Sequence, residues 1–283
     1  MGPRGETAVA DSFAIALLAF LIVCATSAGA ATLKAETIAG WEHYIGRVDA
    51  SMKTASGNEG AFLQLDKEPS QLEEAKRGRV IVSQVKTANR TAVPHGLIHD
   101  WLGALFVADA TLADVFAVTR GYDKYSQWYA PTIARATLVE RDGDRDRFSV
   151  HYVRHVLFVT AVMDVDYETQ YYQVSATRWY SLSHSTRIQE NDQDNRPSER
   201  KAPADDGNGY LWRVFTLTRY EQRDKGVYVE QESIGLSRPI PTSVRWIVEP
   251  VVRRLAKDLL ANSLEQTRAA VVSETGRGKR AVR

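Results

Sequence analysis

Cysteine is nearly absent from this sequence. The one cysteine of the 283 residues, Cys24, lies in an apolar run close to the N-terminus. If that run is removed as an export signal, the remaining chain has no disulfide, no cysteine nucleophile and no cysteine-ligated zinc or iron–sulfur site. A strong charge of either sign is absent too, because the formal net charge is +1. This argues against broad electrostatic binding of nucleic acid.

The sequence also lacks the common signatures of phosphate-binding and nucleophilic enzymes. It contains no glycine-rich phosphate loop, no P-loop and no G-x-S-x-G turn. Its six histidines are dispersed. His151 and His155 are four residues apart, which is a metal spacing on a helix, but they lie in a strand-like run with no third ligand in evidence. We therefore predict no metal, no cofactor and no assignable catalytic residue.

Residues 1–30 have the layout of a secretory signal peptide. An apolar run from Phe13 to Ala25 is followed by small residues, with Ala28-Gly29-Ala30 as the cleavage site. The run is short for a membrane span. The sequence therefore predicts an exported protein, periplasmic or secreted. The alternative is a chain that stays anchored in the membrane by an uncleaved N-terminus.

Residues 31–95 are predicted to form an N-terminal helical extension docked on the main domain. Apolar residues recur at spacings of three and four over 33–55, which indicates one stripe of an amphipathic helix that stops at Gly57. The stripe consists of Ile38, Trp41, Ile45, Val48 and Met52. A short strand is predicted over 80–85. The helix needs an apolar surface to cover, either on this chain or on a partner.

The main domain is predicted over 96–272 and begins with one strand and two helices. A capping box from Thr111 to Asp114 opens the first helix, and Pro131 follows the second. From residue 133 the pattern changes to strands rich in Val, Tyr, Phe and Thr. They are predicted over 137–141, 148–174 (one bent strand or two), 177–189, 211–222 and 227–237. The polar segment 190–209 is predicted to be a mobile loop, and 273–283 a basic tail.

A long amphipathic helix is predicted from about Pro241 to Val272. Its apolar residues recur at helical spacing, and its charged residues lie away from them. The apolar set is Val248, Val251, Val252, Leu255 and Leu259. Because strands precede this helix, we predict an α+β fold in which a curved sheet and the helix across its concave face enclose a ligand cavity.

The order of these elements resembles the START-like (SRPBCC) helix-grip superfamily, in its polyketide cyclase and coenzyme Q-binding-like branch. The resemblance is carried by VFAV at 115–118, YDKY at 122–125, WYAP at 128–131, GVYVE at 226–230 and PIP at 239–241. It implies a curved antiparallel β-sheet wrapped on a long C-terminal α-helix, around a hydrophobic cavity that holds lipids, isoprenoids or polyketides. It implies no catalytic residue, because most members lack a shared catalytic set. The extension and the export signal depart from the usual single compact domain.

The last two strands place charged and apolar residues together. If Asp224-Lys225 is a two-residue loop, Arg219 pairs with Glu230 and Leu217 with Glu232. Strand alternation puts these residues on one face, together with Phe215, Tyr228 and Ile234, and we expect that face to be the concave one. The other face is expected to be solvated. It carries Thr216, Thr218, Tyr220, Gln231 and Ser233.

Two interpretations of the charged residues stay open. Arg219, Glu230 and Glu232 either orient the polar head of a ligand or form a cross-strand ion pair, worth about 0.2–1 kcal/mol, that sets register. The aromatic residues near 122–129 are either core or a pocket wall. His184 is either a pocket donor or a satisfied core histidine, and Asp164 and Asp166 are expected to be solvated or paired with arginine. The predicted ligand-binding residues are Trp128, Tyr129, Tyr180, His184, Phe215, Leu217, Arg219, Glu230 and Glu232.

Three functions are consistent with these features. We favour the non-enzymatic binding or carriage of a hydrophobic small molecule such as a lipid, isoprenoid or polyketide. The second is a cyclase- or hydrolase-type enzyme that uses His184, Glu230 or an aspartate in the cavity. The third is a structural module whose 33–55 helix docks on a partner chain. We expect no nucleic acid and no obligate protein partner, with contact between the basic tail and a membrane surface as an open alternative.

Overall fold

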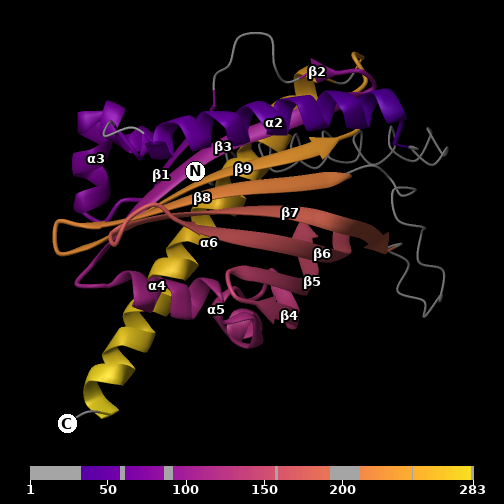
Figure 1. Cartoon of the computed structure of the whole chain (residues 1–283). Coiled ribbons are helices and arrows are strands. Elements are labelled where there is room, and N and C mark those ends of the chain that lie inside the picture. Colours follow the sequence, from indigo (N-terminus) through magenta and orange to yellow (C-terminus); the bar gives the residue numbers. More distant parts are fainter. Residues whose placement is uncertain are drawn as a thin grey trace, which may run out of the picture.

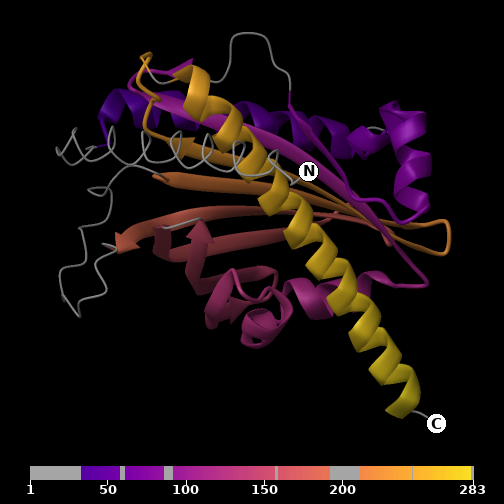
Figure 2. The same ribbon diagram turned by 180° about the vertical axis from the view of Figure 1, so that it is seen from behind.

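Long antiparallel strands dominate the structure, and helices cover both faces of the sheet that they form (Figures 1 and 2). The structure is a computed structural model that describes residues 33–57, 61–85, 92–156, 159–191, 211–243 and 245–281. The predicted signal peptide and most of the predicted loop at 190–209 lie outside these residues. Within the part described, no helix is long and apolar enough to cross a membrane.

The helices lie before, within and after the run of strands. They are α2 (Ala35–Gly57), the 3-10 helix η1 (Gln64–Lys67), α3 (Pro69–Lys76), α4 (Leu112–Thr119), the 3-10 helix η2 (Tyr122–Lys124), α5 (Tyr125–Trp128) and α6 (Arg245–Ala281). The strands are β1 (Ile81–Gln84), β2 (Ala92–Val93), β3 (Gly96–Ala108), β4 (Ile133–Asp142), β5 (Arg145–Val156), β6 (Val159–Gln173), β7 (Arg178–Asn191), β8 (Arg213–Arg223) and β9 (Gly226–Ser237).

The described strands form one sheet in the order β1-β3-β9-β8-β7-β6-β5-β4, with β2 paired to β3. The stretch 148–174 contributes two strands, which was one of the two alternatives. The β8–β9 hairpin has the predicted two-residue loop, because Asp224 and Lys225 both take positive φ values, of 54° and 60°, as a tight hairpin turn requires. The predicted register, with Arg219 opposite Glu230, is confirmed.

One face of the sheet, here called the α6 face, packs against α4 and α6 (Figure 2). Leu260 and Leu264 of α6 lie directly over Gly103 of β3, where a Cβ atom would come within 2.5 Å of Leu264 Cδ1. The first part of α6 is less covered, and Trp246 there is 76% exposed. The helix begins and ends later than predicted, so residues 273–281 of the predicted basic tail belong to it. This arrangement confirms the predicted α+β helix-grip fold.

The opposite face, here called the α2 face, is covered by α2 and the segment that follows it (Figure 1). Trp41 and Met52 of the predicted stripe are buried there, and Ile45 and Val48 pack against the same cluster. The helix predicted over 33–55 is therefore confirmed with a shift of two residues. Because the apolar stripe of α2 packs against this chain's own sheet, it does not need a partner chain to cover it.

Candidate functional site

The helices cover the two faces of the β8–β9 hairpin in the opposite way to the one expected. The face that carries Arg219 and Glu230 lies under α2, not under α6. The face expected to be solvated is the α6 face, where Thr218 and Tyr220 are buried. Strand alternation defines which residues share a face, but it does not say which helix covers that face. The prediction that Arg219, Glu230 and Glu232 lie on the face covered by the C-terminal helix is therefore wrong.

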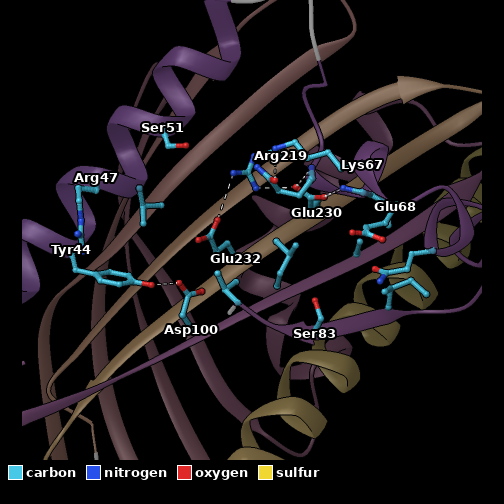
Figure 3. Close-up of a pocket in the computed structure, with 18 residues that line it drawn as sticks. Tyr44, Arg47, Ser51, Lys67, Glu68, Ser83, Asp100, Arg219, Glu230 and Glu232 are labelled. Atoms are coloured by element: carbon cyan, nitrogen blue, oxygen red, sulfur yellow. Dashed lines mark hydrogen bonds and ion pairs between the residues drawn. The ribbon is translucent and has the colours of Figure 1, made fainter. Parts of the chain in front are cut away.

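Glu230 is the centre of a buried polar cluster on the α2 face (Figure 3). Its side chain is fully buried and accepts hydrogen bonds from the backbone N–H groups of Gln64, at 3.0 Å, and Leu65, at 2.8 Å. Arg219 Nη1 donates a third at 2.9 Å, while its Nε contacts Met52 Sδ at 3.2 Å. The cluster therefore joins the β8–β9 hairpin to α2 and η1, which are distant from it in sequence.

Glu232 lies two residues further along β9 and is only 9% exposed. Its ion-pair partner is Arg219, whose Nη2 lies 3.6 Å from Glu232 Oε2, beyond ordinary hydrogen-bond length. Burial raises the pKa of Glu232, and the neighbouring Glu230 raises it further, while Arg219 opposes both effects. Burial also raises the pKa of Glu230, against the opposing effect of Arg219 and the two backbone donors. Both carboxyl groups are thus incompletely compensated for the loss of water.

A pocket of about 540 Å³ opens beside this cluster. It lies between α2, the η1–α3 segment, β1 and the three strands β3, β8 and β9, and Arg219, Glu230 and Glu232 line it. Asp100 of β3 is another lining residue, and its carboxylate accepts a short hydrogen bond from Tyr44 of α2. The pocket is therefore built jointly by the extension and the outer face of the sheet.

Trp128 and Tyr129 lie on the other side of the molecule, with the helices that cover the α6 face. Tyr129 is buried, and its hydroxyl shares a 2.9 Å hydrogen bond with Thr267 of α6. Burial raises the pKa of Tyr129 to about 12. Nearby, Tyr152 of β5 and Tyr167 of β6 face each other with their hydroxyl oxygens 3.2 Å apart.

The predicted ligand-binding residues therefore do not form one site. Arg219, Glu230 and Glu232 line the pocket on the α2 face. On the same face, Phe215, Leu217 and Tyr180 are buried in the core cluster under α2. His184 lies in register with Phe215 but is exposed. Only Trp128 and Tyr129, of the nine, pack beside the α6 face.

Of the residues suggested for an enzyme, Glu230 lines the pocket on the α2 face, whereas His184, Asp164 and Asp166 do not. Glu230 is engaged by three donors. Asp166 accepts hydrogen bonds from Ser149, at 2.6 Å, and Arg187, at 2.7 Å, in agreement with the expected pairing to arginine. His151 pairs with Asp164 at 2.6 Å. Within the described residues, no group of three or more His, Cys, Asp or Glu side chains could hold a metal ion.

Sequence reasoning missed Tyr44, Asp100 and the backbone of η1. Tyr44 lies three residues after Trp41 and four before Val48, so it continues the apolar stripe of α2, and this spacing could have indicated it. Asp100 stands out as an acid in a strand of apolar residues. Nothing in the local sequence indicates that the amides of Gln64 and Leu65 meet a carboxylate about 165 positions away.

Known proteins resemble this chain only distantly. No family model and no curated protein matches the sequence. The chain is similar to the solved STAR-related lipid transfer protein of Xanthomonas axonopodis, with 14% identity over 67% of this chain and 98% of that one and a TM-score of 0.42. It is similar to human STARD10, with 10% identity over 81% and 88% of the two chains and a TM-score of 0.44. It is also similar to the Zhui aromatase/cyclase of a Streptomyces species, with 14% identity over 60% and 94% and a TM-score of 0.37.

All three TM-scores are below 0.5. At identities of 10–14% the likeness concerns the architecture alone. What a ligand would contact must therefore be argued from this chain's own residues.

Proposed function

We propose that the chain binds a hydrophobic small molecule between α6 and the sheet face beneath it. The observation that carries the proposal is the partial exposure of three tyrosines inside the protein, Tyr125, Tyr152 and Tyr167. Each packs against the buried cluster that includes Tyr122, Tyr129 and Phe148, and burial raises the pKa of its hydroxyl. Each nevertheless keeps part of its surface accessible. A side chain that is surrounded by protein and still accessible is what the wall of an internal space would present.

The first part of α6 supports the same proposal. Ile247, Val251 and Leu255 are half-buried, so this apolar stripe is incompletely covered by protein. In Figure 2, this part of the helix runs across the sheet. A guest that covered such surface would gain about 2.5 kcal/mol for every ~100 Å² of apolar area removed from water.

Hydroxyl groups on the sheet supply polar contacts for such a guest. Ser183, Thr216 and Ser233 lie in register on β7, β8 and β9, and all three are half-buried. A mainly apolar and aromatic wall with a few fixed polar groups is the usual composition of a small-molecule site. The START-like resemblance implies a lipid, isoprenoid or polyketide ligand, and the choice among these belongs to experiment.

The proposal is tested by native mass spectrometry of the gently extracted protein and by titration with a dansyl-labelled fatty acid. We expect a co-purified apolar molecule, and fluorescence enhancement on titration. Thr216→Trp should reduce fatty-acid affinity at least tenfold, because the indole would occupy the space above β8. The matched control is Thr137→Trp, at an exposed position of β4. A protein that is always empty, and that binds the probe equally well with either substitution, would refute the proposal.

A further inference from the structure

The pocket on the α2 face is separate from the site proposed above, because the sheet lies between them. We propose that this pocket is a second binding site, and that it takes a small organic cation, an amine with an apolar body. Its volume of about 540 Å³ falls within the usual range of roughly 300–1,000 Å³ for small-molecule sites.

The charges on the floor of the pocket favour a cation. Two carboxyl groups, those of Glu230 and Glu232, line it there, and both are at most 9% exposed. Of the two arginines among the described residues that line the pocket, Arg47 is exposed and Arg219 is buried, with 4% of its surface exposed. Its close contact at 2.9 Å is with Glu230, which two backbone N–H groups also satisfy. The buried floor therefore has an excess of negative charge when its carboxyl groups are ionised.

Glu232 is the carboxylate placed to meet a ligand. It lies between Arg219 and the Tyr44–Asp100 pair in Figure 3. The 3.6 Å between Glu232 Oε2 and Arg219 Nη2 is longer than a hydrogen bond, so this carboxylate can still accept a shorter bond from an ammonium group. The pKa of Glu232 is raised by burial, which is the expected result when a buried carboxylate has too little positive charge beside it. An ammonium group would supply the missing charge.

The rest of the lining suits the hydrocarbon part of such a ligand. Apolar side chains come from four elements or their flanks, namely Val48, Leu65, Ile81, Val85, Leu102 and Ala104. The exposed charged residues Arg47, Lys67 and Glu68 lie at the outer edge, where water screens them. A ligand with one amine and a short apolar or aromatic body would match a charged floor and an apolar wall.

Calorimetric titration of the full chain with three matched probes tests the proposal. The probes are 3-phenylpropan-1-amine, 3-phenylpropan-1-ol and 3-phenylpropionate, which carry a cationic, a neutral and an anionic head. We expect the amine to bind at least tenfold more tightly than the alcohol, and the carboxylate not to bind. Glu232→Gln should lower amine affinity at least tenfold and leave alcohol affinity unchanged. Glu140→Gln, an exposed acid on β4, is the control and should change neither.

A second variant keeps the test independent of how well Glu232→Gln folds. Ser51 is an exposed residue of α2 that lines the pocket, so Ser51→Trp should fold normally, obstruct the pocket and weaken amine binding. Its affinity for the dansyl fatty acid should stay unchanged, because that probe is expected on the other face. The inference is overturned if the amine fails to bind, if amine and alcohol bind alike, or if Glu232→Gln or folded Ser51→Trp retains full amine affinity.

Discussion

At the scale of single residues, Glu230 shows how a charged group can serve the fold. The sequence left open whether it holds a ligand or forms an ion pair that sets register. The structure supports a structural role, because its oxygens accept from Arg219 and from two amides of the segment after α2. Arg219 is close to Glu230 in the sequence, whereas Gln64 and Leu65 are about 165 positions away. Glu230 therefore does more than align β8 with β9.

Glu230→Gln should therefore destabilise the protein by about 1–3 kcal/mol, because its NH2 group would replace an oxygen that accepts from a buried backbone N–H group of Gln64 or Leu65. Urea denaturation followed by circular dichroism measures the change in unfolding free energy. Glu68→Gln, at an exposed position on the pocket edge, should stay within about 0.5 kcal/mol of the parent. Equal stability of the two variants would contradict the structural role.

At the scale of elements, α6 can lie close to β3 because residue 103 of β3 is a glycine and has no side chain. A Cβ atom at Gly103 would lie 2.5 Å from Leu264 and 3.0 Å from Leu260. Such contacts force neighbouring side chains or the helix to move. The core half of α6 is thus held by close packing, whereas its first half stays partly exposed.

Gly103→Ala should destabilise the protein by about 1–3 kcal/mol through overpacking. The matched control is Gly46→Ala in α2, where the added methyl group meets nothing within 4 Å. That change should stabilise the protein by about 0.4–1 kcal/mol, because alanine loses less conformational freedom in a helix. Thermal unfolding of the two variants should shift in opposite directions. A rise in melting temperature for Gly103→Ala would show that α6 is not tightly seated there.

Local patterns predicted most of these elements. The spacing from Trp41 to Met52 predicted α2, and the capping box at Thr111, in which Asp114 accepts from the Thr111 N–H at 2.8 Å, predicted the start of α4. The tight loop at Asp224 predicted the register of the last hairpin, because a two-residue turn leaves one pairing. Each of these signals depends on a few neighbouring residues, so it can be recognised in the sequence without knowledge of the tertiary structure.

The location of the site could not be predicted in the same way. The sequence contains two amphipathic helices, α2 and α6, and the sheet has two faces. The alternation in β8 and β9 does not say which helix covers which face. The segment 61–76 has no long periodic pattern, so nothing indicated that its amides would meet Glu230. Contacts across 165 or 166 positions depend on the complete chain topology.

At the scale of the whole molecule, the N-terminal extension is part of the core. Buried residues of α2 and the following segment pack with those of β3, β8 and β9 in one cluster, which includes Met52, Phe62, Phe215 and Tyr228. The fold therefore has helices on both faces of the sheet, and each face carries a separate candidate site.

Deleting residues 1–76 should expose the α2 face and leave a chain that aggregates or fails to fold, because a large apolar surface would meet water. Size-exclusion chromatography and near-ultraviolet circular dichroism measure this. Deletion of residues 1–32 alone is the control and should leave a folded protein. A monomeric, cooperatively folded 77–283 fragment would show that the sheet needs no cover from the extension.

The contact between Glu230 and main-chain amides has a consequence for how this chain tolerates change. A carboxylate that bonds to N–H groups is indifferent to side-chain identity at the residue that supplies them. The half-buried position Gln64 should thus accept many amino acids during divergence, yet not proline, whose nitrogen carries no hydrogen. Homologues that keep the acid at position 230 should accordingly vary at position 64 while avoiding this one residue.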